Sequence, residues 1–121
     1  MNNNSQATFS MILAQLLNEE MRVKNLKQKD FLDLTGISAA TWSRITRGQS
    51  SFSVEDLRAA CRVLGVDNAE LIQKADQVVA ELPSMDVEVV APVGPSGAAK
   101  FAGMFIAAAA LAFLISRIVR R

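Results

Sequence analysis

Positively charged side chains are the chemically most informative residues of this sequence. Between Arg22 and Arg47, six basic residues stand against two acidic ones, a local net charge of +4. Residues 1–82 as a whole carry nine basic and ten acidic residues, so the excess of positive charge is local to this stretch. Nucleic acids favour such a local basic surface over a basic average. The six are Arg22, Lys24, Lys27, Lys29, Arg44 and Arg47.

Residue types that carry out catalysis are nearly absent. The chain has no histidine and a single cysteine, Cys61, which excludes an internal disulfide. Cys61 lies in an apolar helical pattern, which is typical of inert packing. No metal-ligand cluster and no nucleophile–base arrangement can be assembled. We therefore expect no enzyme, no catalytic residue, no metal site and no cofactor.

Helix start and stop signals divide residues 9–82 into five short helices. Apolar residues at helical spacing predict the first helix. Gly36 and Gly65 favour helix ends, because glycine adopts the left-handed conformation without a Cβ penalty. Ser38, Ser53 and Asp67 are suitable N-caps for the helices that follow them. The expected helices are 9–24, 27–35, 39–47, 54–64 and 68–82. Such a series predicts an all-α, five-helix bundle.

The segments on either side of this bundle differ from it in composition. Residues 1–8 are expected to be a disordered N-terminus without signal-peptide features, which favours a cytoplasmic domain. Residues 83–97 are rich in proline and glycine and are expected to form a linker. Residues 98–121 follow as a continuous apolar C-terminal helix.

That C-terminal helix has more than one interpretation. Fifteen residues from Phe101 to Ile115 are apolar or small, and the stretch 98–119 reaches the length of a membrane span if Lys100 and Arg117 snorkel. A membrane anchor is therefore the favoured hypothesis. The three arginines at its far end argue against it, because such charges stay in the cytoplasm. A self-association helix, an interfacial helix and a site for another partner are the alternatives.

The run LKQKDFLDLTGISAATWSRITRG resembles the Cro/C1-type (XRE) helix-turn-helix family. The match extends through GQSSFSVEDLRAACRVLGV, so the resemblance covers roughly Leu26–Leu71. Leu32 and Thr46 depart from the family, which usually has an alanine and an acidic residue at these places. The resemblance implies a Cro/C1-like bundle in which the helix at 38–47 enters the major groove of double-stranded DNA. The matching positions are Gln28, Phe31, Gly36, Ile37, Ser38, Thr41, Ser43, Arg44, Ile45 and Gly48.

The resemblance also implies the roles of individual residues. Gln28 would brace a phosphate, four residues would face base edges, and Ser43 and Arg47 would lie near the backbone. The chemistry agrees in part, because arginine can bond O6 and N7 of guanine and alanine methyls suit the thymine methyl. Lys27, Lys29 and the amides of residues 48–51 are further phosphate ligands. The four base-facing residues are Ser38, Ala39, Ala40 and Arg44.

The same residues have plainer interpretations. Without a role in DNA binding, Lys27, Lys29, Arg44 and Arg47 are solvated surface charges. Ala39 and Ala40 are then simple helix formers. Trp42 occupies a position where the family has a buried aliphatic residue, so we expect it in the core rather than stacked on a base.

Together these features predict a sequence-specific DNA-binding transcriptional regulator, a repressor that acts as a homodimer. The domain would be cytoplasmic, and its C-terminal helix would tether it to the inner membrane or assist dimerisation. One alternative is a membrane-anchored protein-interaction module, since RodZ-type cytoskeletal anchors join a Cro/C1-like domain to a transmembrane helix. Another is the antitoxin of a toxin–antitoxin pair, which has the same DNA-binding chemistry.

Overall fold

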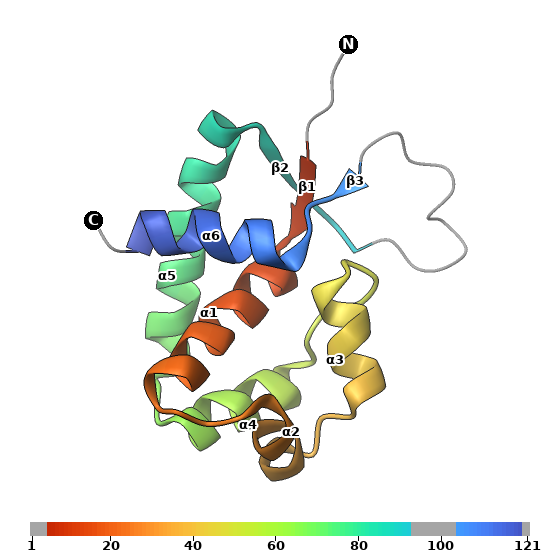
Figure 1. The fold of residues 1–121 in the computed structure, drawn as a ribbon, viewed down its shortest axis with the longest axis vertical. Coiled ribbons are helices and arrows are strands. Elements are labelled where there is room, and N and C mark those ends of the chain that lie inside the picture. The colour runs from red at the N-terminus through yellow and green to blue at the C-terminus, as the bar shows by residue number, and fades with distance from the viewer. Residues whose placement is uncertain (1–4, 93–103, 120–121) are drawn as a thin grey trace.

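The computed structural model describes residues 5–92 and 104–119 (Figure 1). Its fold is mostly helical, with a helix-turn-helix in the N-terminal part and a helix near the C-terminus, which confirms the predicted class. The helices are α1 (Phe9–Val23), α2 (Gln28–Thr35), α3 (Ala39–Thr46), α4 (Val54–Leu64), α5 (Asn68–Glu81) and α6 (Ala108–Val119). The other elements are β1 (Ser5–Thr8), the 3-10 helix η1 (Leu82–Met85), β2 (Val87–Val90) and β3 (Met104–Phe105).

Local capping sets the helix ends, largely where the sequence predicts them. The side chains of Ser38, Ser53 and Asp67 accept hydrogen bonds from backbone amides in the first turns of α3, α4 and α5. Gly36 and Gly65 end α2 and α4 with φ angles of 80° and 67°, in the left-handed region that suits glycine. These short-range interactions explain why the observed helices 1 to 5 follow the predicted ranges closely.

Helix α1 is the centre of the molecule (Figure 1). All residues from Ser10 to Leu17 are buried, because α3, α4, α5 and α6 all pack against this helix. A helix that is buried on every side needs apolar residues all round, and the run MILAQLL supplies them with the exception of Gln15. The core therefore forms around α1, and the surrounding helices contribute one buried face each.

A small parallel sheet joins three distant parts of the chain. The strand order is β2-β1-β3, with Ser5 opposite both Val87 and Met104. The prediction of disorder over residues 1–8 is therefore wrong for Ser5–Thr8, and the predicted linker contains β2 and all of η1 except Leu82. Pairing with partners far along the chain satisfies the backbone of these short segments. Residues 1–4 and 93–97 lie outside the described residues, and the domain limits stay predictions.

The C-terminal helix differs from its prediction. A continuous helix was expected over 98–121, but β3 occupies Met104–Phe105 and α6 begins at Ala108. Residues 98–103, 120 and 121 lie outside the described residues. Leu111, Ile115 and Ile118 are buried, and α6 packs against α1 and α5. Within residues 5–92 and 104–119, no helix combines the length and apolar character that crossing a membrane requires.

Candidate nucleic-acid interface

The turn between α2 and α3 is held by hydrogen bonds that begin at the end of α2. The amide of Gly36 donates to the Leu32 carbonyl at 2.9 Å, and the Thr35 hydroxyl donates to the same carbonyl at 3.2 Å. The Thr35 oxygen also accepts from the amide of Ile37 at 3.2 Å. Ile37 is buried at 4% exposure and fixes the turn to the core. The turn therefore holds α2 and α3 in a defined relative orientation.

Aromatic packing fixes which face of α3 points inward. Trp42 is 4% exposed, and its ring packs edge-to-face against Phe31 of α2 and Phe52, with centroids 5.5 Å and 5.9 Å apart. Ile45, one helical turn later, is fully buried. The prediction that Trp42 belongs to the core is confirmed. The opposite face of α3 is consequently left toward solvent.

That outward face carries the residues expected to contact base edges. Ser38, Ala39, Ala40 and Arg44 are exposed, and so is Arg47, whereas Ser43 is half-buried. The structure thus places the six predicted α3 residues at or near one accessible surface. Their contact with DNA stays a prediction.

Thr41 links the polar residues of this face and was missing from the predicted site. Its hydroxyl oxygen accepts from the Ser38 hydroxyl at 2.9 Å and from an Arg44 guanidinium nitrogen at 3.3 Å. The three residues are spaced three apart, so they stack along one side of the helix. Such spacing was the available signal in the sequence. Thr41 orients the Arg44 guanidinium along α3.

A hollow of about 350 Å³ lies between the first turns of α2 and α3 and collects further predicted residues. Gln28 and Lys29 meet Ser38 and Ala39 there, with Leu32, Ile37 and Asp33 completing the wall. Lys27, the N-cap of α2, is exposed and has no side-chain acceptor to offer. The first amides of α2 therefore remain uncapped, and such helix starts favour anions. The Asp33 carboxylate opposes an anion in the same hollow.

The C-terminal end of α3 contradicts one prediction. The amides of residues 48–51 were predicted as phosphate ligands, but two of them already donate hydrogen bonds to carbonyls in the last turn of α3. Gly48 N donates to the Ile45 carbonyl at 3.1 Å, and Gln49 N donates to the Arg44 carbonyl at 2.8 Å. The prediction is wrong for these two groups, because the last carbonyls of α3 need donors of their own.

The arginines of α3 carry uncompensated charge. Among residues 5–92 and 104–119, neither Arg44 nor Arg47 forms an ion pair with a carboxylate. Arg47 Nε donates to the Ser43 carbonyl at 3.3 Å, and Thr46 donates to the same carbonyl at 3.0 Å. Thr46 stands where the family that the sequence resembles usually has an acidic residue, so no carboxylate at this position competes for the two guanidinium groups. Both guanidinium groups are available to phosphate or bases.

Comparison with known proteins agrees with this geometry. A sequence model described as a helix-turn-helix domain matches residues 12–72, just over half of the chain. The matched region begins in α1 and ends in α5, so it includes all of α2, the turn and α3. No curated protein and no solved structure matches the chain.

Proposed function

Because this chain belongs to the helix-turn-helix domain family, we propose that it is a sequence-specific DNA-binding transcriptional regulator of the Cro/C1 (XRE) type. In this proposal α3 enters the major groove, which is about 12 Å wide and admits one α-helix. The proposal also assigns the partner, double-stranded DNA. No enzymatic activity is part of it.

The observation that carries the proposal is the two-sided character of α3. Trp42 and Ile45 bind one side of the helix to the core, while Ser38, Thr41 and Arg44 form a hydrogen-bonded row on the other. A short helix used only for packing does not need an ordered polar row on its solvent side. A row of donors and acceptors at fixed spacing suits the edges of successive base pairs.

Each residue has a role that follows from its chemistry and position. Arg44 would read guanine through O6 and N7, and Ala39 and Ala40 would contact thymine methyl groups. The phosphate ligands would hold α3 in register on the duplex without reading sequence. They are Lys27, Gln28 and Lys29 at the start of α2, with Ser43 and Arg47 on α3.

The proposed regulator acts as a homodimer and a repressor. One recognition helix covers few base pairs, so a two-fold operator with half-sites about 34 Å apart supplies the missing specificity. A dimer seated on such an operator blocks access to the duplex, which makes repression the simplest outcome. Helix α6 belongs to the folded domain in this proposal, since Leu111, Ile115 and Ile118 are buried against it.

Selection of duplexes from a genomic library, followed by fluorescence anisotropy on the selected operator, tests the proposal. Arg44→Ala should weaken operator binding by about 1–3 kcal/mol and relax selectivity at one base pair. Lys29→Ala should weaken operator and random duplex alike and reduce the salt slope by about one. Arg58→Ala, at an exposed position of α4 outside the interface, is the matched control and should change neither.

The outcome that would overturn the proposal is equally direct. If no duplex binds better than random sequence at moderate salt, the chain is not a sequence-specific regulator. If operator binding survives Arg44→Ala without loss of affinity or selectivity, α3 is not the reading helix.

A further inference from the structure

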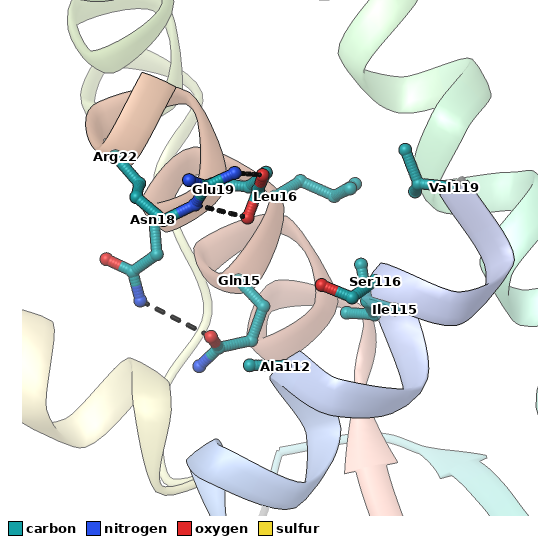
Figure 2. Close-up of a pocket in the computed structure, with 9 residues that line it drawn as sticks. All are labelled: Gln15, Leu16, Asn18, Glu19, Arg22, Ala112, Ile115, Ser116 and Val119. Carbon is teal, nitrogen blue, oxygen red and sulfur yellow. Dashed lines mark hydrogen bonds and ion pairs between the residues drawn. The ribbon is translucent and has the colours of Figure 1, made fainter. Parts of the chain in front are cut away.

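A pocket lies between α1 and α6, away from the residues assigned to DNA (Figure 2). Its cavity volume is about 210 Å³, and it is lined by one side of α1 and one side of α6. Cavities of roughly 150 Å³ already hold a benzene molecule. By the same measure this one has room for roughly eight non-hydrogen atoms.

The walls of the pocket have different chemistry. Helix α6 contributes Ala112, Ile115 and Val119, and α1 adds Leu16, so the body of the pocket is apolar. The polar groups are gathered on α1, with the Ser116 hydroxyl as the contribution of α6. This combination of an apolar body and a few convergent polar groups is what small-molecule sites present.

Gln15 supplies a polar group that can bind a ligand. The residue is only 6% exposed, and its Oε1 accepts from Asn18 Nδ2 at 3.4 Å. Its Nε2 has no hydrogen-bond acceptor among residues 5–92 and 104–119. Figure 2 shows this amide extending from α1 toward Ala112 of α6, into the pocket. Among the described residues no side-chain nitrogen or oxygen that is buried from solvent lacks a partner, so water reaches this Nε2 through the pocket. A ligand carbonyl would take the place of that water.

A second free polar group faces the same space. Figure 2 shows the Ser116 hydroxyl extending from α6 toward α1, and it has no hydrogen bond to the described residues. Glu19 and Arg22 at one end of the pocket form an ion pair with each other, so each of these charges already has an opposite charge beside it. A charged ligand would therefore lose its hydration on entering the pocket without gaining an ion pair there. The pocket favours an uncharged molecule.

We propose that the pocket between α1 and α6 binds a small uncharged organic molecule with an apolar body and a carbonyl acceptor. The carbonyl oxygen accepts from Gln15 Nε2 and the Ser116 hydroxyl, and the apolar body lies against Leu16, Ile115 and Val119. This site is distinct from the DNA-binding surface, and binding there does not depend on the proposed function.

Proton–nitrogen correlation NMR of the full chain, titrated with hexanamide, tests the proposal. Hexanamide has eight non-hydrogen atoms, an alkyl body and one carbonyl. We expect saturable shifts in the Gln15 side-chain amide and in backbone amides of α1 and α6. Hexanoate and hexylammonium share the alkyl body but carry charge, and each should bind at least about tenfold more weakly.

Variants locate the binding site. Ala112→Leu fills the pocket and Gln15→Met removes the donor at similar length, so each should abolish the saturable shifts. Ser116→Ala, a milder change, should weaken binding severalfold. Ala109→Leu on the exposed side of α6 is the matched control and should leave the titration unchanged. Trp42 fluorescence verifies that each variant is folded.

Two results would overturn the site. One is the absence of saturable shifts with hexanamide in the folded chain. The other is a titration that is the same in Ala112→Leu and Ser116→Ala as in the unchanged chain. Since no DNA is present in the experiment, either failure is distinguishable from failure of the proposed regulator.

Discussion

The ring of Phe105 lies directly against Gly48. A Cβ placed on Gly48 would stand 2.7 Å from two carbons of that ring, closer than side chains tolerate. Gly48 follows the last residues of α3, and Phe105 belongs to β3, which leads into α6. The C-terminal segment therefore contacts the chain where the proposed recognition helix ends.

Gly48→Ala should consequently destabilise the fold more than the same change at Gly36. Both glycines have φ of 80°, so the backbone penalty of about 1 kcal/mol is common to the two variants. Gly36 has open space around it, whereas Gly48 meets the Phe105 ring. We expect an extra loss of about 1–3 kcal/mol at Gly48 from this overpacking. Urea unfolding followed by Trp42 fluorescence measures the difference.

The double variant Gly48→Ala with Phe105→Ala separates the two causes. Removing the ring costs stability by itself, yet the added cost of the alanine should fall to the value found at Gly36. Equal losses at Gly36 and Gly48 in the single variants would show that the ring contact does not constrain Gly48.

Thr41→Val should lower operator affinity more than it lowers the stability of the fold. The change removes the hydroxyl that receives hydrogen bonds from Ser38 and Arg44 and keeps the β-branched shape. Loss of one such hydrogen bond corresponds to about 1 kcal/mol, or roughly fivefold weaker binding. Anisotropy on the selected operator measures it. Thr46→Val is the matched control, because it is the same substitution in the same helix but away from Arg44. We expect unchanged operator affinity for this variant. An equal loss of affinity in both variants would refute the role of Thr41 in positioning Arg44.

Ile115→Ala and Phe113→Ala distinguish the two sides of α6. Ile115 is 2% exposed in the core, so its truncation should cost about 2–5 kcal/mol. Phe113 is 62% exposed, and its truncation should change stability by no more than about 0.5 kcal/mol. Chemical denaturation of the purified chain gives both values. The reverse order would mean that α6 does not pack in this orientation in solution.

Cys61 should make stability sensitive to alkaline pH. Burial, and secondly the charge of Asp67, raise the pKa of the Cys61 thiol above its ordinary value. The contribution to stability is therefore fully present below the pKa of the unfolded thiol and is lost as pH rises through the higher pKa of the folded one. As pH rises above the ordinary thiol pKa of about 8.5, the unchanged chain should lose more stability than Cys61→Ala. Parallel pH profiles for the two chains would contradict this cause.

Helix ends were the most predictable part of the fold because local residues determine them. Ser38, for example, caps α3 through a hydrogen bond to Thr41 N at 3.0 Å, three residues away. The strands were not predictable, since Ser5–Thr8 has no apolar alternation and pairs with Val87–Val90 far along the chain. The packing of α6 was not predictable either, because an apolar helix has the same sequence pattern whether it faces a membrane or a protein core.

The candidate site likewise has features that the sequence predicts and features that it does not. Exposure of Arg44 and burial of Trp42 follow from the helical period once one face is known to pack. The spacing of three places Thr41 between Ser38 and Arg44, but its hydrogen bonds to them depend on side-chain rotamers, which spacing does not determine. The occupied amides of Gly48 and Gln49 depend on how the last turn of α3 closes, and helix ends can close in several ways.

The central position of β1 in the sheet has a consequence for synthesis of the chain. Strand β1 leaves the ribosome before β2 and β3, the two strands that flank it. Helices α1 to α5 can assemble while both edges of β1 still lack partners, and unpaired edges invite association between nascent chains. Chains stalled before residue 87 should therefore show β1 open to protease, and protection there should increase as β2 and then β3 are translated.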